Sequence, residues 1–157
     1  MVDVVRAVPT DAPGLSEIAW AAKAAWGYPV DQMRRWRQEL VLSAVSIENC
    51  PTFLVRHDEP AGFYQLRSKV RAGYELAHLW VSPARMGRGI GQALVGHAMA
   101  LLAASGIPDV DVDSDPNAEG FYLSLGARRL SVVRAPIPGD QARVRPQLVL
   151  STRVRSA

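Results

Sequence analysis

Apolar residues recur along the 157-residue chain with two periods, and the order of these periods predicts the elements of the fold. Segments that alternate apolar with polar residues, or that form short apolar runs, are typical of strands. Seven segments are expected as strands: Val2–Val8, Pro51–Arg56, Ala61–Ser68, Gly73–Val81, Val110–Val112, Arg128–Arg134 and Gln147–Val154. The turn signal His57–Pro60 separates the second strand from the third.

Four other segments carry apolar residues three and four positions apart, which is the period of a helix. They cover residues 10–26, 30–42, 90–105 and 117–125. Their inner faces are formed by Leu15, Ile18, Ala19, Ala22 and Trp26 in the first helix, Met33, Trp36, Leu40 and Val41 in the second, and Ile90, Leu94, Ala98 and Leu101 in the third. We expect His57 and His97 at the surface.

Composition narrows the class of protein. With 157 residues, 48% of them apolar, the chain suits one globular domain, residues 1–157, that buries a core. No apolar run reaches the length of a membrane span, and we expect no signal peptide. Cys50 is the single cysteine, which excludes an intrachain disulfide and favours a cytoplasmic location. The net charge of +3, with scattered arginines and an acidic stretch at 109–115, argues against nucleic-acid binding.

The most informative segment lies between the fourth strand and the third helix. Val81-Ser82-Pro83 closes the strand, and Gly87, Gly89 and Gly91 follow at alternate positions before the helix. Glycine has no side chain, so a ligand can approach the peptide N–H groups closely. The first turn of a helix adds unpaired N–H donors and the positive end of the helix dipole. This segment therefore predicts an anion site, most naturally for phosphate.

The glycine spacing excludes two common phosphate sites. A dinucleotide-binding loop needs Gly-x-Gly-x-x-Gly, but Gln92 stands three residues after Gly89. A Walker loop needs Gly-Lys-Ser/Thr, a tripeptide that the chain lacks. The segment resembles instead the pyrophosphate loop of the GNAT superfamily of acetyl-CoA-dependent N-acyltransferases, Arg/Gln-x-x-Gly-x-Gly/Ala after Val-x-Pro. Met86 stands where this family usually has Arg or Gln, and Arg85 precedes it.

A second segment resembles the other GNAT signature, Asn-x-x-Ala-x-x-Phe-Tyr followed by a Gly-Phe-like step. It runs from Asp115 to Tyr122, with Gly126-Ala127 after it. Asp115 occupies the usual Asn position, and Ala127 the usual Phe. The two segments stand in the order and at the separation typical of the family, so the resemblance covers nearly the whole chain.

The resemblance implies a fold and an activity. The fold is a mixed α/β GNAT fold, with a mostly antiparallel, twisted sheet of six to seven strands, splayed between the fourth and fifth and flanked by about four helices. The activity is N-acetylation, in which a primary amine attacks acetyl-CoA, the co-substrate, directly within a ternary complex. No metal is expected, since no His, Cys and carboxylate cluster has metal-ligand spacing.

The resemblance also implies roles for individual residues. Tyr122 occupies the position of the family's general acid, and a phenol with a pKa of about 10 can protonate the departing thiolate at neutral pH. Glu75 and His78 are the first candidates for the general base, with Asp111 or Asp113 as alternatives. The implied contacts with acetyl-CoA are Leu79, Trp80, Val81, Met86, Gly87, Arg88, Gly89, Ile90, Gly91, Gln92, Asn117 and Tyr122.

Several alternatives stay open. Trp26 and Tyr28, at the junction of the first two helices, either line an acceptor pocket for a cationic or aromatic amine or staple the helix corner to the sheet. The acceptor is a small-molecule or a peptide amine, and a homodimer through the C-terminal strands stays open. The competing hypothesis is a non-catalytic GNAT-fold module that binds CoA as a sensor or scaffold. We expect no nucleic-acid or membrane partner.

Overall fold

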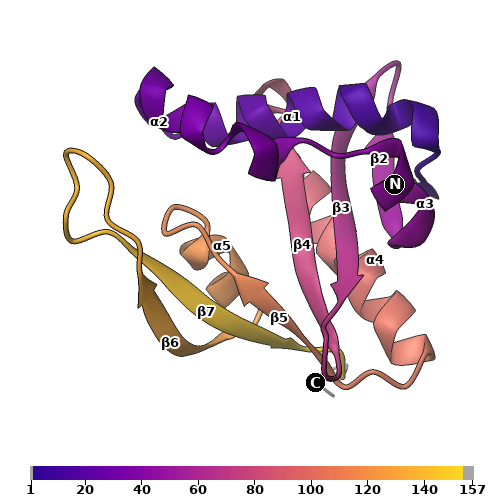
Figure 1. Ribbon diagram of the computed structural model, residues 1–157. Coiled ribbons are helices and arrows are strands. Elements are labelled where there is room, and N and C mark those ends of the chain that lie inside the picture. The colour runs from indigo at the N-terminus through magenta and orange to yellow at the C-terminus, as the bar shows by residue number, and fades with distance from the viewer. Residues whose placement is uncertain (1, 154–157) are drawn as a thin grey trace. The chain divides into compact units, whose positions relative to one another are not determined.

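The segments predicted as strands join in one seven-stranded sheet with the order β1-β2-β3-β4-β5-β7-β6 (Figure 1). The computed structural model describes residues 2–153 and bounds the strands as β1 Val4–Arg6, β2 Thr52–Arg56, β3 Pro60–Ser68, β4 Tyr74–Val81, β5 Asp109–Asp113, β6 Arg128–Arg134 and β7 Val144–Ser151. The pairing is antiparallel for β1–β2, β2–β3, β5–β7 and β6–β7, and parallel for β4–β5. This mixed, mostly antiparallel sheet confirms the predicted fold class.

The chain divides into two units. Among the described residues, unit 1 comprises 2–67 and 78–98, and unit 2 comprises 68–77 and 99–153. The strand β4 and the helix α4 (Ile90–Ala104) therefore contribute residues to both units. Each unit is described separately below, and the single domain expected over the whole chain stays a prediction.

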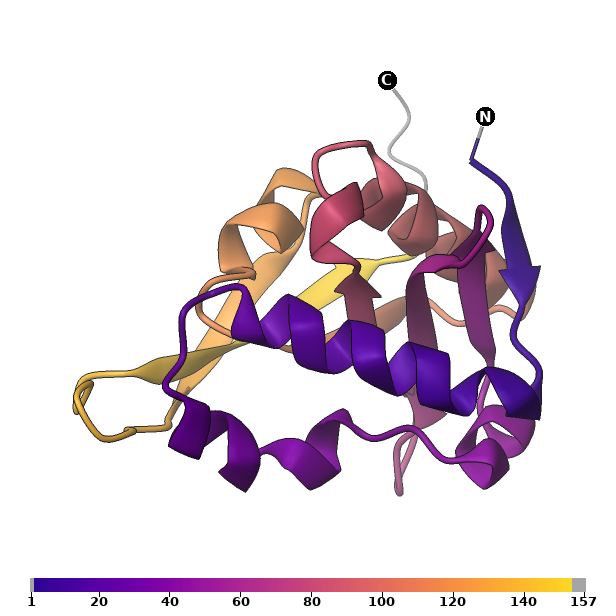
Figure 2. The same ribbon diagram turned by 90° about the horizontal axis from the view of Figure 1, so that it is seen from above.

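Unit 1 contains the longest helix of the N-terminal half, α1 (Ala12–Ala24). Pro13 fits its first turn, where a missing N–H costs little, and Gly27 with φ of +87° ends the segment. The predicted apolar stripe from Leu15 to Ala22 is buried, and most of it packs with Met33 and Phe63 in one core cluster. Figures 1 and 2 together show α1 on one side of β2 and β3 and the first part of α4 on the other.

The single helix predicted over residues 30–42 is wrong in its second half. The structure has a short helix, α2 (Val30–Arg35), a 3-10 helix, η2 (Arg37–Leu40), and then extended backbone at Val41. The reason lies in α1, because the Leu42 N–H donates to Ser16 Oγ at 2.9 Å, a contact that holds the chain out of the helix. As a result Val41, predicted on the inner face, is 55% exposed.

A helix that the periodicity does not predict, α3 (Ala44–Asn49), follows directly. Ser43 caps it, because its Oγ accepts a hydrogen bond from the Ser46 N–H at 3.0 Å. Ile47 is its buried residue. A helix of six residues with one buried position shows no recognisable period of apolar residues. The capping serine was the one local sign of a helix start.

The helix α4 shows that periodicity misplaces side chains near the border of an apolar stripe. Leu102 is buried, and the predicted Leu101 is half-buried. His97, expected at the surface, is half-buried, because its Nδ1 shares a hydrogen bond of 2.7 Å with the Tyr64 hydroxyl and its ring contacts Phe53. An imidazole one step off the stripe is long enough to reach these strand residues. No helix among residues 2–153 combines the length and apolarity needed to cross a bilayer.

In unit 2 the strand β7 lies between β5 and β6. The register pairs Val110 and Val112 of β5 with Leu150 and Leu148 of β7, and all four side chains are buried. Alternation along both strands therefore places one apolar face in the core of this unit.

The C-terminal strand differs from its predicted limits. The sequence predicts Gln147–Val154, whereas β7 begins at Val144 and ends at Ser151. Proline has no N–H to donate to a neighbouring strand, so we did not expect the strand to begin before Pro146. The structure accommodates this proline opposite Val132, and its carbonyl accepts from the Ser114 N–H at 2.9 Å. Val154 lies outside the described residues.

Candidate active site

The glycine-rich segment forms an exposed turn between β4 and α4. A 3-10 helix, η3 (Pro83–Arg85), follows the strand, and Gly87 and Gly89 then take φ of +77° and +78°. Such values suit glycine and are costly for other residues, which explains two of the three glycines. A Cβ at either position would meet no atom within 4 Å, so the space beside both is open. Gly91 lies in the first turn of α4 and has no positive φ.

The first turn of α4 presents amide groups next to this turn. The first intrahelical bond runs from the Ala93 N–H to the Gly89 carbonyl, at 3.0 Å. The amides of Ile90, Gly91 and Gln92 precede it, so no carbonyl of the helix accepts from them. With 15 residues, α4 also brings the positive end of its dipole here. A helix start with open backbone before it is the arrangement that binds phosphate.

Buried side chains hold this helix start against the strands of unit 1. Ile90 and Leu94 are 3% and 0% exposed. A Cβ on Gly62 of β3 would lie 3.0 Å from Ile90 Cγ2 and 3.0 Å from the Trp80 carbonyl oxygen. Gly62 therefore allows α4 to approach β3 closely, and nothing in the sequence around it signals this contact.

The end of β4 carries three of the predicted acetyl-CoA contacts, 79–81, and all three residues are half-buried. The Trp80 ring packs against Trp26, with ring centroids 5.9 Å apart. Its Nε1–H donates to His78 Nδ1 at 3.0 Å. The Trp80 side chain is thus held by a ring contact and by a hydrogen bond at its polar edge.

The hydrogen bond from Trp80 determines which nitrogen of His78 carries the hydrogen. An indole N–H only donates, so Nδ1 accepts and the neutral ring carries its hydrogen on Nε2. Burial, with a smaller contribution from the positive charge of Arg67, lowers the pKa of His78 to about 4. At neutral pH the ring is therefore uncharged and offers Nε2–H as a donor. This state favours a hydrogen-bond donor over a general base.

Because its folded pKa lies below the ordinary value, His78 is expected to make stability fall in acid. The unfolded chain takes up this proton as the pH drops through about 6.5, whereas the folded chain resists protonation down to about 4. The free energy of unfolding should lose about 3 kcal/mol from this residue across that window. Urea denaturation at several pH values measures the loss. An equal loss in a His78→Gln variant would show that another group causes it.

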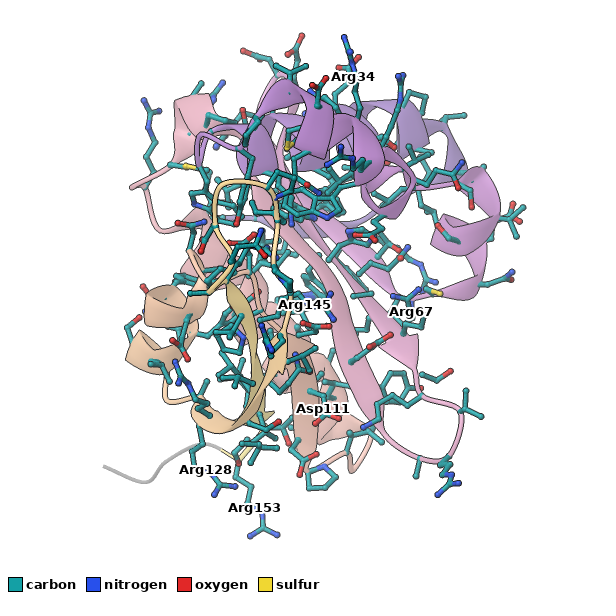
Figure 3. The ribbon with its side chains drawn as sticks, turned by 60° about the vertical axis from the view of Figure 1, so that its left-hand side comes forward. Arg34, Arg67, Asp111, Arg128, Arg145 and Arg153 are labelled. Carbon is teal, nitrogen blue, oxygen red and sulfur yellow. The ribbon has the colours of Figure 1, made fainter. Side chains whose placement is uncertain are left out.

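The other candidates for the base lie in unit 2. Glu75 of β4 stands opposite Asp111 of β5 in the parallel register. Asp111, labelled in Figure 3, forms an ion pair with Lys69. Asp113 accepts from Arg145 Nε at 3.1 Å. Both aspartates are thus held in ion pairs, and the negative charge of Glu75 also acts on Lys69.

Tyr122 is the buried residue of α5 (Glu119–Ser124), with 6% exposure. Its ring meets Phe121 at an angle of 68°, with centroids 5.3 Å apart. Its carbonyl accepts from the Ala127 N–H at 3.1 Å, after the chain turns at Gly126. Burial raises the pKa of the Tyr122 phenol above its ordinary value. The hydroxyl therefore stays protonated at neutral pH, as a proton donor must.

Asp115, at the usual Asn position of the second signature, is held by a network within unit 2. Its Oδ1 accepts from the backbone N–H of Asn117 at 2.8 Å and from the Asn117 side chain at 2.9 Å. Its Oδ2 lies 3.3 Å from Arg143 Nη2, in an ion pair whose side chains are 5% and 4% exposed. Asn117, a predicted contact with acetyl-CoA, thus turns its side chain toward Asp115.

The two aromatic residues at the helix junction contact different neighbours. Trp26 packs against Trp80, whereas Tyr28 meets Trp36 edge to face, with centroids 4.8 Å apart. The Lys23 Nζ lies 4.2 Å from the Trp36 ring centroid and 5.7 Å from that of Tyr28. These two rings therefore already hold an ammonium group of the chain itself. The contacts favour the staple interpretation, and the acceptor interpretation stays a prediction.

The predicted site residues divide between the two units. Unit 1 holds the glycine turn, the end of β4, His78 and the two aromatic residues, and unit 2 holds Glu75, Asn117 and Tyr122. Sequence reasoning missed Gly62 and Arg143, because neither lies in a motif and their contacts are remote in the chain. Within residues 2–153, no group of three or more His, Cys, Asp or Glu side chains could hold a metal ion.

Comparison with known proteins identifies the family and the fold. The model of the acetyltransferase (GNAT) family matches residues 13–127. Among solved structures, a GCN5-related N-acetyltransferase from Rhodopseudomonas palustris is similar over 96% of both chains, with a TM-score of 0.76 and 21% identity. The ribosomal-protein-S18-alanine N-acetyltransferase from Escherichia coli is similar over 99% of this chain and 97% of its own, with a TM-score of 0.72 and 18% identity.

The PaiA N-acetyltransferase from Thermoplasma acidophilum, whose crystal structure is a complex with coenzyme A, is similar over 96% of this chain and 99% of its own. Its TM-score is 0.68 and its identity 17%. No curated protein matches the sequence. At these identities the structural likeness shows the fold alone, whereas the family match spans more than half of the chain. The protein therefore belongs to the acetyltransferase (GNAT) family.

Proposed function

We propose that this protein is an acetyl-CoA-dependent N-acetyltransferase that transfers the acetyl group to a primary amine by direct attack in a ternary complex. The open turn with positive φ at Gly87 and Gly89, directly before the first turn of α4, carries this proposal. Its amides suit the diphosphate of coenzyme A. The family match and the neighbour crystallised with coenzyme A support the same co-substrate.

The proposed contacts with acetyl-CoA use mainly the backbone. The amides of residues 87–92 bind the diphosphate, and the exposed Arg88 adds a positive charge beside them. Met86 is 45% exposed and carries no charge, which matters little when main-chain donors bind the ligand. The pantetheine arm pairs with the main chain of residues 79–81, beyond Tyr74 and Glu75, the two residues of β4 in register with β5.

The proposed reaction needs few groups from the chain. The neutral amine attacks the thioester carbonyl carbon, and a main-chain N–H near Val81 stabilises the oxyanion, an effect worth about 3 kcal/mol for a good donor. As the carbon–sulfur bond breaks, Tyr122 gives its phenolic proton to the departing thiolate. The surplus proton of the amine passes to a base, and Tyr122 regains a proton from solvent. The products are the N-acetyl amine and free coenzyme A.

We assign the base role to Glu75. A lysine-like amine has a pKa of about 10.4 in water, so it must lose a proton before it can attack. Glu75 is the first candidate from the sequence and belongs to β4, the strand that also carries residues 79–81, whereas the Nδ1 of His78 already accepts from Trp80. Glu75 acts directly or through a water molecule, and His78 contributes its Nε2–H as a donor.

The proposed acceptor is a small-molecule or peptide amine. The name of the Escherichia coli neighbour specifies an alanine of a ribosomal protein, so the fold accommodates a peptide amine in that enzyme. Trp26 and Tyr28, at the junction of the first two helices, are the candidate lining of the acceptor site, and an amine bound there would compete with Lys23 for the Tyr28 ring. A panel of amino acids, polyamines and peptides in a coenzyme A release assay would identify the class.

Gly89→Ala is expected to weaken acetyl-CoA binding at least about tenfold, because a Cβ at this φ of +78° costs about 1–2 kcal/mol and displaces the amides. Gly139→Ala is the matched control. Gly139 has φ of +87°, and its added Cβ also meets nothing within 4 Å, but it lies in the connection between β6 and β7. Both variants should lose similar stability, and calorimetry should show weaker binding for Gly89→Ala alone.

Two outcomes with the unmodified protein decide whether it binds acetyl-CoA and whether it is an enzyme. If acetyl-CoA produces neither binding heat nor protection against thermal unfolding, the proposed function is wrong. If acetyl-CoA binds and no amine in the panel is acetylated, the competing non-catalytic module is the better description.

A further inference from the structure

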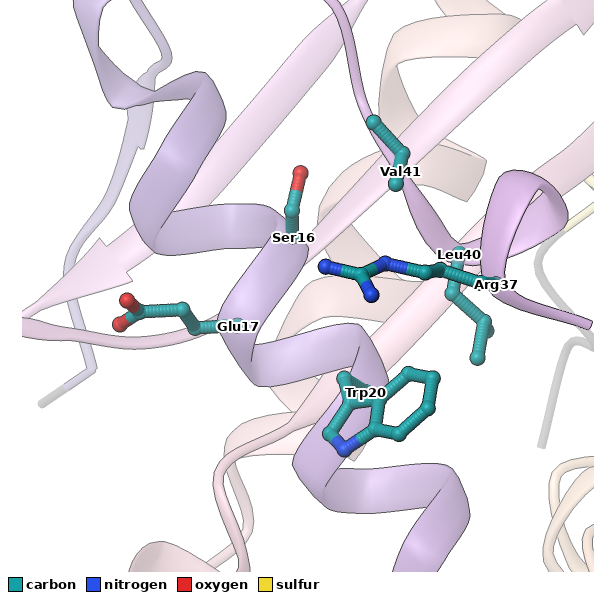
Figure 4. A pocket seen from close by; sticks show the side chains of 6 residues that line it. All are labelled: Ser16, Glu17, Trp20, Arg37, Leu40 and Val41. Atoms are coloured by element: carbon teal, nitrogen blue, oxygen red, sulfur yellow. The ribbon is translucent and has the colours of Figure 1, made fainter. Parts of the chain in front are cut away.

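A pocket of about 330 Å³ lies in unit 1, away from the glycine turn in the sequence (Figure 4). It is lined by Ser16, Glu17 and Trp20 of α1 and by Arg37, Leu40 and Val41 at η2. Its volume is at the lower end of the range of small-molecule sites. None of its lining residues belongs to the turn, to β4 or to α5, and Trp26 and Tyr28 do not line it either.

Arg37 supplies the positive charge of this pocket. Figure 4 shows its guanidinium extending toward α1, between Ser16 and Trp20. Across residues 2–153 it makes no ion pair, hydrogen bond or ring contact, whereas Arg34 pairs with Asp31 and Arg35 with Gln32. A planar guanidinium with unused donors matches a carboxylate, which it can bind with two parallel hydrogen bonds.

The other polar groups of the pocket limit what can bind. The Ser16 hydroxyl donates to the Ala12 carbonyl at 2.8 Å and accepts from the Leu42 N–H at 2.9 Å, so it is already used. The Glu17 carboxylate points away from Arg37 in Figure 4. Its negative charge at the same pocket disfavours a doubly charged anion such as phosphate, and a single negative charge suits the site better.

Apolar surface forms the rest of the pocket. Leu40 is buried, Trp20 is half-buried, and Val41 is 55% exposed. The bond between Leu42 and Ser16 that ends η2 is what leaves Val41 outside the core. An indole face and two aliphatic side chains beside one guanidinium favour a ligand with a flat or branched apolar body and an acidic end.

We propose that this pocket binds a small monocarboxylate with an apolar body, its carboxylate on Arg37 and its body on Trp20, Leu40 and Val41. The site is separate from the proposed acetyl-CoA contacts. It gives the protein a second ligand whose binding requires no acetyl-CoA.

Calorimetry on the full chain without acetyl-CoA tests the proposal with three probes. They have the same phenylpropyl group and differ in the polar end: 3-phenylpropionate, 3-phenylpropan-1-ol and 3-phenylpropylamine. The carboxylate should bind at least about tenfold more tightly than the alcohol or the amine, a difference of about 1.4 kcal/mol. Equal binding of all three, or no saturable binding of the carboxylate, would overturn the proposal. Displacement of the carboxylate by an equal concentration of inorganic phosphate would show a general anion site instead.

Arg37→Gln should abolish the preference for the carboxylate while leaving the melting temperature nearly unchanged, because Arg37 is exposed and its guanidinium has no partner among residues 2–153. Arg34→Gln is the matched control, since Arg34 points into solvent in Figure 3 and does not line the pocket. It should keep the preference. Gly89→Ala should also keep it, so a failed acetyl-CoA titration and a failed carboxylate titration remain distinguishable. Loss of the preference in Arg34→Gln as well would indicate a diffuse charge effect and no built site.

Discussion

Replacing Tyr122 with phenylalanine is expected to lower kcat at least about 100-fold with little change in acetyl-CoA affinity. The variant keeps the ring that fills the buried position in α5 and removes only the phenolic proton. Burial raises the pKa of this phenol, so the group is fully protonated at neutral pH and can serve as the proton donor of the proposed reaction. A proton donated in the transition state and not in the ground state affects kcat more than binding.

The control is Tyr74→Phe, which removes a hydroxyl from the half-buried first residue of β4. It should leave kcat nearly unchanged. An acetyl thioester with a more acidic thiol should also narrow the gap between Tyr122→Phe and the unmodified protein, because a better leaving group needs less protonation. A Tyr122→Phe variant with normal kcat and lower thermal stability would show that Tyr122 is only a packing residue.

Replacing Asp115 with alanine is expected to destabilise the fold by about 3–5 kcal/mol. The carboxylate and Arg143 are almost completely buried, and removal of one member of such a pair leaves the other charge without this compensation. Alanine also removes the acceptor for both the main-chain and the side-chain donors of Asn117. Denaturant unfolding of the variant measures the loss.

A double-mutant cycle separates the two contributions. Asp115→Asn keeps an acceptor for Asn117 and removes the charge, Arg143→Met removes the cation, and the double variant should recover part of the loss. Asp113→Asn is the control, because its pair with Arg145 has side chains that are 47% and 43% exposed and should contribute less than about 1 kcal/mol. Equal effects of Asp113→Asn and Asp115→Asn would contradict the buried pair.

This buried pair also bears on the second sequence signature. Asp115 differs from the usual Asn of the family, and its oxygens are used by Asn117 and Arg143 within unit 2. A structural role therefore accounts for the carboxylate without any contact with acetyl-CoA. Weaker acetyl-CoA binding in Asp115→Asn at a temperature where the variant is fully folded would give it a ligand role as well.

Local patterns determined the order of the seven strands and of α1, α4 and α5, together with the glycine turn. The strands β5 and β7 alternate with period two, and α1 and α4 carry apolar residues three and four positions apart, signals that depend only on near neighbours. The requirement for positive φ at Gly87 and Gly89 is equally local, because it depends on the backbone of one residue. The two family signatures are short stretches of consecutive residues, so they can be recognised without knowledge of the fold.

The tertiary structure decided what depends on residues remote in the chain. The end of η2 depends on the bond between Leu42 and Ser16, 26 residues apart, and the position of His97 depends on Tyr64, 33 residues away. The ion pair of Asp115 joins it to Arg143 across 28 residues.

The sequence by itself therefore determined the glycine turn, because backbone requirements act between near neighbours, and the resemblance of its two signatures indicated the family and the candidates for catalysis. Only the tertiary structure decided which nitrogen of His78 accepts from Trp80, what holds Asp115, and that Arg37 faces a pocket. These depend on packing, which brings distant side chains within hydrogen-bond distance and sets how much water reaches them.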